Sequence, residues 1–434
     1  MQVSRRGEDR EPPFRPGRGT LATPDSRRLD RLLRPLFQGL PPTSGIAVAV
    51  VRGEEHTVAC RGFTDPAAQR PVRADSRFEL GSITKTFTAL LLAEMVARGE
   101  VRYDDPIDAY LPAGAVPGYP KERPITLLHL ATHTSGLPRL PFGLQQSAAS
   151  QWFTRPCATF GVTHLLRALS RTPVRGTPGT QVRYSSLGSG LLGLLLENAA
   201  GTRYEDLLAS RVCQPLGMVD TSCGAGDEGG GSYRRGRRVP SFRFATLPGA
   251  SALRSSADDM LRYLQALIAA DRSWVNRLDV LRSAQGEPVD PGSALRIALS
   301  EVRRPRAARR TTGTRLCLGW KQRSWAPVPA PALVPLTGRV QSPLLEDGPE
   351  GGEEAAGFAA AADLDGFSGG HHAGPEPELL FHEGGTRDFL AFAGFAPAHA
   401  TGMVALISGP PQRRRRYLQT VYDTVRGLCV EELS

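Results

Sequence analysis

Lysine is nearly missing from this chain. The 434 residues contain 53 lysines and arginines together, but only three of these are lysines, Lys85, Lys121 and Lys321. Long apolar runs are missing as well, since no stretch reaches about 18 uninterrupted apolar residues, the length that spans a bilayer. The twin arginine Arg5-Arg6 is not followed by the apolar segment of a secretion signal. We therefore expect a cytoplasmic protein without a membrane span.

Closely spaced cysteines are also absent. The six cysteines are scattered along the chain, with no CxxC pair and no short spacing between cysteine and histidine. This pattern argues against a zinc knuckle. It leaves a disulfide framework open, but so few cysteines in a long chain are more typical of a reducing compartment. We expect no cofactor and no metal.

The net charge of +10 belongs to four arginine-rich stretches. Residues 1–28, 233–243, 303–315 and 413–416 together carry +18, which leaves −8 on the rest of the chain. A nucleic-acid binder needs its basic residues on one face. Solvated basic loops explain the distribution better. We expect no nucleic-acid partner, although binding through 233–243 or 303–315 stays an alternative.

Hydrophobic patterning divides the chain into a globular domain and appendages. With 40% hydrophobic and 22% charged residues, the composition is that of a globular protein. Residues 1–28 are predicted to be a disordered tail rich in Arg, Pro and Gly, and residues 29–434 the folded domain. Within that domain, about 104–270 reads as a mainly helical subdomain and about 322–377 as a low-complexity insertion.

Apolar and β-branched runs predict strands near both ends of the chain. The expected strands are 45–53, 56–63, 77–82, 316–320, 378–384, 389–397 and 402–408. The expected helices are 29–38, 84–99, 125–131, 186–199, 204–213, 255–270 and 416–430. Strands at both ends around a helical middle indicate one sheet assembled from the two ends, with a helical domain inserted.

The strongest chemical signal is Ser82-Ile83-Thr84-Lys85, placed where an extended segment turns into a helix. A serine and a lysine three residues apart lie on one helical face, with Cβ atoms about 5–6 Å apart. A hydroxyl is a poor nucleophile without a neighbouring base or positive field, and a partly desolvated lysine supplies either. The helix dipole favours negative charge at the same place. Alone the pattern is weak, because at average serine usage roughly 7% of lysines have a serine three residues earlier by chance.

The surrounding sequence resembles the superfamily of serine β-lactamases and penicillin-binding proteins. The similarity is greatest to the branch that holds class C β-lactamases, D-alanyl-D-alanine carboxypeptidases and related esterases. The matching phrases follow the family's order and occupy 78–112, 125–138, 178–201, 204–222, 249–267 and 382–392. The resemblance implies an α/β (α+β) fold of the β-lactamase/transpeptidase-like type, with an antiparallel sheet flanked by helices. It also implies a serine nucleophile, but it does not specify a substrate.

The resemblance implies catalytic roles for three residues. Ser82 is the expected acylated nucleophile and Lys85 its activating partner. Tyr184, at the head of Tyr184-Ser185-Ser186, matches the tyrosine of the family's Y-x-N motif. A phenol near a cationic lysine has its anionic form favoured, which suits it to take the Ser82 proton and return it to a leaving group.

The resemblance implies a second set of residues around the substrate. His382-Glu383-Gly384 matches the third motif, which is K-T-G in β-lactamases and often H-x-G in esterases and peptidases of this branch. The backbone N–H groups of Ser82 and Gly385 are the expected oxyanion hole, and glycine there permits close approach of the backbone to the substrate.

Two departures bear on the substrate. Ser186 stands where β-lactamases usually carry an asparagine that binds the acyl-amide side chain. His382 replaces the lysine of K-T-G and is mostly uncharged at neutral pH, so it anchors a carboxylate less firmly. Both changes weaken the case for a β-lactam hydrolase.

Other motifs carry less weight. His129 and His133 lie four residues apart on one helical face, but no third ligand is evident, so packing explains them better than a metal. His371-His372 reads as solvated loop within the insertion. The glycines 229–231 lack a following helix and lysine, so they imply no phosphate loop.

We therefore predict a serine hydrolase that cleaves a small-molecule ester, amide or peptide through an acyl-Ser82 intermediate. Water, or an acceptor alcohol or amine, would release the acyl group. An esterase or acyltransferase-like activity ranks above a D-Ala-D-Ala carboxypeptidase or D-aminopeptidase, and that above a β-lactamase. A non-catalytic binding relative stays an alternative because of Ser186 and the end strand Ile407-Ser408-Gly409. Nothing in the sequence specifies an oligomeric state.

Overall fold

The computed structural model describes most of the chain outside its arginine-rich and low-complexity segments. The described residues are 25–38, 40–41, 44–65, 69–120, 122–141, 160–223, 232–234, 237–239, 246–270, 289–309, 314–324, 378–386, 388–409 and 413–430. Nearly all of the expected tail, most of the expected insertion, the histidines 371–372 and the glycines 229–231 lie outside these residues.

Nine of the described strands form one large antiparallel sheet with the order β3-β2-β1-β13-β12-β11-β10-β9-β8. Its long members are β1 (Gly45–Arg52), β2 (Glu55–Asp65), β11 (Glu378–Gly385), β12 (Phe389–Ala396) and β13 (Thr401–Ser408). Its short members are β3 (Arg70–Pro71), β8 (Ala307–Ala308), β9 (Arg315–Leu316) and β10 (Lys321–Ser324). Strand β1 pairs with β13 from Gly45 opposite Ser408 to Arg52 opposite Thr401. The prediction of a sheet built from both ends of the chain is therefore confirmed.

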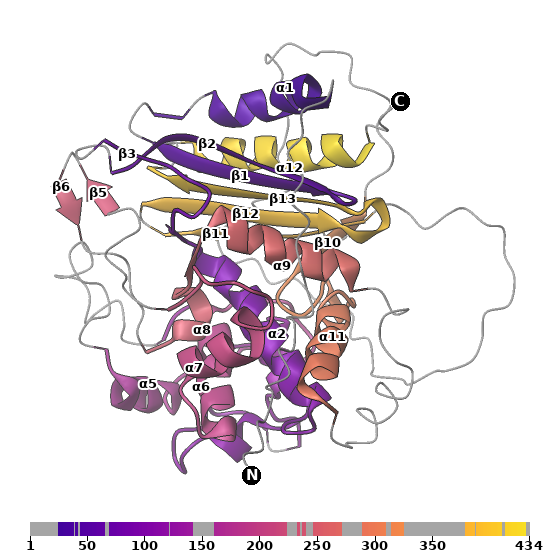
Figure 1. Ribbon diagram of the computed structural model, residues 1–434. Helices are drawn as coiled ribbons and strands as arrows, with labels where there is room; N and C mark the ends of the chain where they lie inside the picture. The colour runs from indigo at the N-terminus through magenta and orange to yellow at the C-terminus, as the bar shows by residue number, and fades with distance from the viewer. Residues whose placement is uncertain are drawn as a thin grey trace, which may run out of the picture.

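Side chains alternate between the two faces of this sheet, as the pleat requires. On β1, Ile46, Val48 and Val50 pack toward helices α1 (Asp25–Phe37) and α12 (Arg414–Val430), while Ala47 and Ala49 face the rest of the molecule. Figure 1 shows α1 and α12 above the sheet and the other helices below it. The protein thus has three layers, and the sheet separates two apolar cores.

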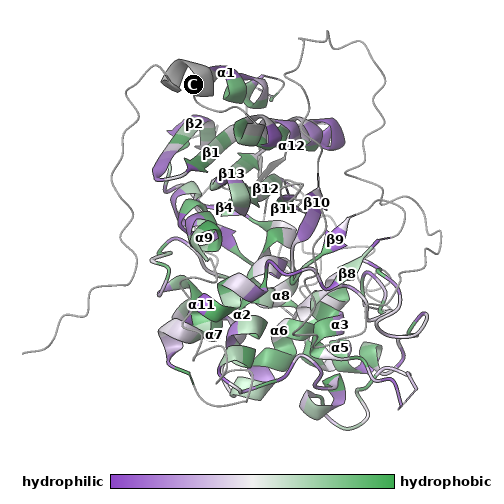
Figure 2. Ribbon diagram, turned by 90° about the vertical axis from the view of Figure 1, so that its right-hand side faces the viewer, coloured by the Kyte–Doolittle hydropathy of each residue, from purple (hydrophilic) through white to green (hydrophobic). Residues whose placement is uncertain are grey.

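The lower layer is built around helix α2 (Thr84–Ala97), in which nearly every residue is buried. Helix α2 packs against α6 (Ser186–Ala200), α8 (Pro248–Ser251) and α11 (Pro291–Glu301), while α9 (Ala257–Ala269) covers the sheet. Figure 2 shows hydrophobic ribbon on β1 and β13 in the sheet and on α6 within the lower layer. A helix buried on all sides is apolar all round, which explains the unbroken run of apolar residues in 89–93.

The remaining described elements are short. They are α3 (Leu127–Ala131), α5 (Val162–Leu169), α7 (Tyr204–Leu208), the π-helix η3 (Ala209–Cys213), the 3₁₀ helices η1 (Gly81–Ile83), η2 (Ile107–Tyr110) and η5 (Pro397–His399), and the strands β4 (Phe78–Glu79), β5 (Ser232–Arg234), β6 (Arg237–Val239) and β7 (Arg254–Ser255). Among the described residues, no helix combines the length and apolar character needed to cross a membrane.

Several expected boundaries differ from the structure. The expected strand 77–82 is only the short β4 (Phe78–Glu79), followed by the 3₁₀ helix η1 (Gly81–Ile83). Helix α1 begins at Asp25, inside the expected tail, and residues 322–324 belong to β10 rather than to the expected insertion. The expected strand 316–320 was wrong as a single element, because the chain turns between β9 and β10. Gly319 adopts φ +73° there, and the Cys317 N–H donates to the Trp320 carbonyl. A positive φ of this kind favours glycine and breaks an extended run.

Candidate active site

Ser82 lies in the short helical turn η1, which continues directly into α2. Gly81 precedes it with φ +52°, a left-handed conformation that glycine adopts without strain. Strand β11 passes against this turn, since a Cβ on Gly81 would stand 2.8 Å from Gly385 N. The turn therefore holds Ser82 between the sheet and the amino end of a buried helix.

Two side chains donate hydrogen bonds to the Ser82 hydroxyl. Lys85 Nζ donates to Ser82 Oγ at 3.1 Å, and Tyr184 OH donates to the same oxygen at 2.7 Å. Lys85 is only 3% exposed, and its ammonium also donates to the carbonyl of Ala250 at 2.8 Å. The three residues singled out in the sequence are thus in direct contact, although Tyr184 is about a hundred residues from Ser82 in the chain.

The phenol of Tyr184 lies in a positive environment. Lys85 Nζ is 5.1 Å and the Arg139 guanidinium 5.5 Å from the centroid of its ring. Burial alone raises the pKa of Tyr184, but the charge of Lys85, hydrogen bonds with Lys85 and Ser82, and the charge of Lys321 outweigh it. The pKa of Tyr184 therefore lies below its ordinary value, which makes its anionic form more accessible as a base.

His133 packs against the ring of Tyr184 and accepts hydrogen bonds from the two residues that flank it. The N–H of Arg183 donates to the His133 carbonyl at 2.7 Å, and the N–H of Ser185 donates to its Nδ1 at 3.3 Å. The two rings pack with their centroids 4.6 Å apart. Burial, followed by the charge of Lys85, holds the pKa of His133 well below its ordinary range, so the ring is neutral and its proton is on Nε2. The histidine expected to be a packing residue thus packs on the tyrosine of the site.

His129 has a local structural role. Its Nδ1 accepts the Thr126 N–H at 3.2 Å, and Thr126 Oγ1 accepts the His129 N–H at 3.4 Å, which caps helix α3. In the part of the chain that the structure describes, no group of three or more His, Cys, Asp or Glu side chains is arranged to hold a metal ion.

His382, Glu383 and Gly384 lie on β11, next to the Ser82 turn. His382 is 3% exposed, and its Nδ1 donates to the Glu383 carbonyl at 2.8 Å. Burial, together with the charges of Lys321 and Lys85, keeps the pKa of His382 well below its ordinary range. The imidazole is therefore neutral, as expected from the sequence, and its Nε2 is an acceptor.

The close approach of β11 to the Ser82 turn depends on Gly384. A Cβ on Gly384 would stand 1.9 Å from Leu80 O and 3.1 Å from Ser82 N. A Cβ on Gly385 would meet nothing nearer than Arg414 Nη1 at 3.6 Å. The close approach of the Gly385 backbone to a substrate stays a prediction, whereas the tight contact between backbone segments is at Gly384. The main-chain N–H of Gly385 is still next to the Ser82 turn.

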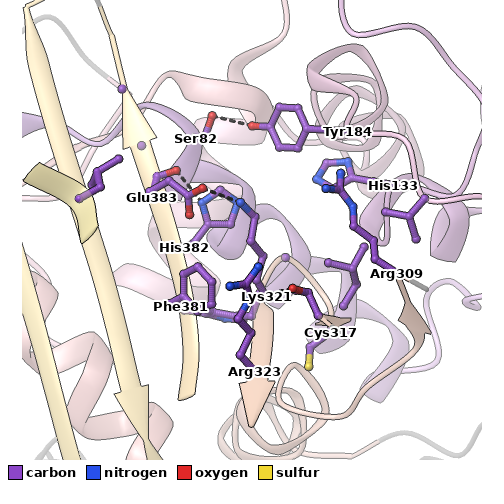
Figure 3. A pocket seen from close by; sticks show the side chains of 18 of the residues that line it. Ser82, His133, Tyr184, Arg309, Cys317, Lys321, Arg323, Phe381, His382 and Glu383 are labelled. Atoms are coloured by element: carbon purple, nitrogen blue, oxygen red, sulfur yellow. Dashed lines mark hydrogen bonds and ion pairs between the residues drawn. The ribbon is translucent and has the colours of Figure 1, made fainter. Parts of the chain in front are cut away.

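These residues border a cavity of about 300 Å³. Figure 3 shows Ser82 and Tyr184 along its upper edge, with His382, Glu383 and Lys321 below them. Ser82, Tyr184, His382, Gly384 and Gly385 all line it. Ser186 does not line this cavity; it is the first residue of α6, which the neighbouring Ser185 side chain caps by accepting from Gly188 N at 2.8 Å.

Lys321 also lines this cavity, although it belongs to none of the sequence motifs. It comes from β10, and its Nζ forms an ion pair with Glu383 Oε1 at 2.5 Å. Its charge contributes to the lowered pKa values of Tyr184, His133 and His382. The one signal in the sequence was the scarcity of lysine, since two of the three lysines of the chain line or border this site.

The Beta-lactamase family model matches residues 33–424. The chain belongs to the Beta-lactamase family. Its relatives in this family include the D-alanyl-D-alanine-carboxypeptidase/endopeptidase AmpH of Escherichia coli K12, 33% identical over 56% of this chain and 62% of AmpH. Esterase EstB of Burkholderia gladioli is 31% identical over 56% of this chain and 70% of EstB.

A beta-lactamase of Escherichia coli K12 is also similar, at 31% identity over 54% of this chain and 59% of that protein. The chain thus matches about three fifths of the length of AmpH and of this beta-lactamase. Among solved structures, a class C beta-lactamase superposes with a TM-score of 0.67 at 21% identity, covering 94% of this chain and 97% of the other. The β-lactamase/transpeptidase-like fold expected from the sequence is confirmed.

Proposed function

We propose that this protein is a serine hydrolase that cleaves an ester or amide through an acyl-Ser82 intermediate, with esterase activity as its main reaction. The observation that carries the proposal is the pair of contacts to Ser82 Oγ, from Lys85 Nζ at 3.1 Å and Tyr184 OH at 2.7 Å. A nucleophile, a candidate base and a cation in mutual hydrogen-bond reach are the arrangement that covalent catalysis requires.

In the proposed reaction, the anionic form of Tyr184 takes the Ser82 proton as Ser82 Oγ bonds to the substrate carbonyl carbon. The N–H groups of Ser82 and Gly385 stabilise the oxyanion. Tyr184 then returns the proton to the leaving oxygen or nitrogen as that bond breaks. In the second half, water loses a proton to Tyr184 as the water oxygen bonds to the acyl carbon. The bond between Ser82 Oγ and the acyl carbon then breaks, Ser82 Oγ takes the proton from Tyr184, and the acid is released. An acceptor alcohol or amine in place of water would make the reaction an acyl transfer.

Three features favour an ester over a β-lactam. His382 is neutral, Ser186 does not line the cavity, and Esterase EstB is among the relatives. A D-alanyl-D-alanine carboxypeptidase activity is the second candidate, because AmpH is similar at 33% identity and Lys321 adds a cation to the site. Peptide carboxylates are recognised by such cations.

The decisive experiment is the mass of the intact protein after exposure to a nitrophenyl ester, a chromogenic cephalosporin or a D-Ala-D-Ala peptide. We expect an adduct with the ester that forms and clears in the native protein and is absent from Ser82→Ala. A fluorophosphonate probe should label the native protein at the same residue. No label on the native protein, or equal label on Ser82→Ala, would contradict the proposal and favour a non-catalytic relative.

A further inference from the structure

Lys85, which contacts Ser82, is also held by a segment outside the cavity. Its Nζ donates to the Ala250 carbonyl at 2.8 Å. Ala250 belongs to α8, a helix of only four residues, and the last carbonyls of a helix have no donor within it. Among the described residues, those of α8 are not part of the cavity lining. The place of α8 in the fold therefore decides where one acceptor of this ammonium lies.

Thr88 binds α8 to the same face of helix α2. Its Oγ1 donates to the Gly249 carbonyl at 2.8 Å. Thr88 follows Lys85 by three residues, so the two side chains lie next to one another on α2. Their acceptors, the carbonyls of Gly249 and Ala250, are likewise adjacent in α8. A shift of α8 away from Thr88 would therefore also move the acceptor of Lys85.

Tyr204, the first residue of α7, donates to the Thr88 hydroxyl. Its OH lies 2.7 Å from Thr88 Oγ1, and both residues are 1% exposed. Thr88 Oγ1 has one hydrogen and two carbonyl acceptors within reach, Gly249 O at 2.8 Å and Thr84 O at 3.2 Å. Since that hydrogen goes to a carbonyl, the hydrogen between the two hydroxyls comes from Tyr204. Burial holds the pKa of Tyr204 well above its ordinary value, so the phenol stays protonated and keeps donating.

The donation from Tyr204 determines which carbonyl the Thr88 hydroxyl bonds. A threonine within a helix readily bonds the carbonyl four residues earlier, which here is Thr84 O. With one lone pair of Thr88 Oγ1 occupied by Tyr204, the hydrogen is directed at the closer acceptor, Gly249 O. Without Tyr204, the hydroxyl is free to rotate toward Thr84 O, and α8 loses this link to α2.

The packing around α8 is close on every side that these contacts involve. A Cβ on Gly249 would stand 3.1 Å from Thr88 Oγ1 and 3.1 Å from Gly193 Cα of α6. A Cβ on Gly193 would stand 3.2 Å from Cδ2 of Tyr204. Figure 1 shows α6, α7 and α8 grouped beside α2. The Ala250 carbonyl therefore has a defined position, set jointly by three neighbouring helices.

We propose that Thr88 and Tyr204 are positioning residues of the active site, which through α8 hold the carbonyl that orients the Lys85 ammonium toward Ser82. This proposal rests on the proposed acyl-Ser82 chemistry. One ammonium hydrogen points at Ser82 Oγ at 3.1 Å and another at the α8 carbonyl at 2.8 Å, so displacing that carbonyl turns the ammonium. Neither Thr88 nor Tyr204 is among the residues that line the cavity. They therefore act on the rate of the reaction and not on the binding of a substrate.

The first test is the rate at which a fluorophosphonate labels Ser82, a reaction in which Ser82 Oγ bonds to phosphorus as fluoride leaves. Thr88→Val removes the hydroxyl at nearly constant shape. The Leu253 N–H still donates to Thr84 Oγ1 in this variant, so α8 should shift rather than detach. Since a displacement of about 1 Å costs on the order of 100-fold in rate, a smaller shift should lower the maximal labelling rate by about 10-fold. The half-saturating probe concentration should stay at the native value, and Thr88→Ser, which keeps the hydroxyl, should restore most of the rate.

Tyr204→Phe should lower the maximal labelling rate by a smaller factor, because the Thr88 hydroxyl remains. Tyr263→Phe is the matched control. Tyr263 is fully buried, and its OH donates to Thr86 Oγ1 of α2 at 3.3 Å, but Thr86 is two residues from Thr88 and so lies on another face of the helix. Tyr263→Phe should leave the rate unchanged. The double variant of Thr88→Val with Tyr204→Phe should label no more slowly than Thr88→Val alone, because both changes break one chain of hydrogen bonds.

A second readout needs no reaction at Ser82. The chain contains only three lysines, so lysine labelled with carbon-13 at Cε gives a simple NMR spectrum, in which Lys85→Arg identifies the signal of Lys85. That signal should move in Thr88→Val and in Tyr204→Phe and stay in place in Tyr263→Phe. A loss of core stability alone would leave the Lys85 signal of the folded protein unchanged.

Native labelling rates in Thr88→Val and Tyr204→Phe would overturn the positioning role while sparing the proposed function. A native protein without label would contradict the proposed function; a Lys85 signal that moves in both variants would then still support the positioning of the ammonium, and an unmoved signal would refute it. If Thr88→Val does not fold, the comparison of Tyr204→Phe with Tyr263→Phe decides. Equal behaviour of these two variants in both readouts would refute the role of Tyr204.

Discussion

Replacing Gly384 by alanine tests the geometry around Ser82 most sharply. The added Cβ would stand 1.9 Å from Leu80 O, a distance that real Cβ atoms essentially never show, and 3.1 Å from Ser82 N. Both contacts are with backbone, so no side chain can rotate away. To restore a contact of 3.0 Å, β11 and the Ser82 turn must separate by about 1 Å. The N–H groups of Ser82 and Gly385, which we propose form the oxyanion hole, would then move apart.

A misplacement of about 1 Å at a reacting centre costs on the order of 100-fold in rate, so we expect Gly384→Ala to lower kcat for a nitrophenyl ester by about that factor. Overpacking should also cost about 1–3 kcal/mol in the free energy of unfolding, measured by urea titration. Gly385→Ala is the matched control, because its Cβ has room and its N–H is kept. Equal activity of the two variants, or loss in Gly385→Ala alone, would refute this account of the oxyanion site.

Three further predictions concern the tyrosine and histidines. Tyr184→Phe should lower kcat by about 10²–10⁴-fold, the usual contribution of general base catalysis, while Ser82→Ala remains the control for background hydrolysis. His133→Leu leaves the Ser185 N–H without its acceptor and should cost about 1–3 kcal/mol of unfolding free energy; His133→Asn, which tolerates the φ of +58°, should retain more activity. The folded-state pKa of His382 lies below its unfolded value of 6.5, so its stabilising contribution is complete above pH 6.5 and is lost as the pH falls toward the folded value. Between pH 7.5 and pH 5.5, the free energy of unfolding measured by urea titration should accordingly fall less in His382→Gln than in the native protein. An equal fall in the two proteins would contradict this.

The sequence could predict the parts of this structure that local patterns encode. Ser82 and Lys85 are one helical turn apart, so their contact follows from helix geometry alone. The strands of both chain ends are continuous apolar runs because both faces of β1, β12 and β13 are buried. Such runs predict buried strands, and their position at the two ends predicts that they meet in one sheet. The contact of Tyr184 with Ser82 needed the family resemblance, since no local period links residues so far apart.

Lys321 could not be predicted because its place depends on strand register. It pairs opposite Phe381, and the segment between them falls largely outside the described residues. The turn at Gly319 separates β9 from β10, so that β10 begins at Lys321. This turn decides whether Lys321 reaches the site. A hydrophobic pattern read as one strand over 316–320 hides this turn, because apolar residues continue through it. The side of a strand that a residue occupies reverses with a shift of one position.

The protonation of Tyr184 shows why the motif alone is insufficient for the proposed chemistry. Burial raises the pKa of this phenol, and only the charges of Lys85 and Lys321, with the hydrogen bonds at its hydroxyl, bring the pKa below its ordinary value. Lys85 is on a helix of the lower layer and Lys321 on a strand of the sheet. Since a Coulomb interaction weakens with distance and with access of water, separating the two layers would return Tyr184 to a weakly acidic phenol. The lowered pKa of the tyrosine is therefore a property of the packed interface between sheet and helices, and a tyrosine beside a Ser-x-x-Lys sequence outside that interface would lack it.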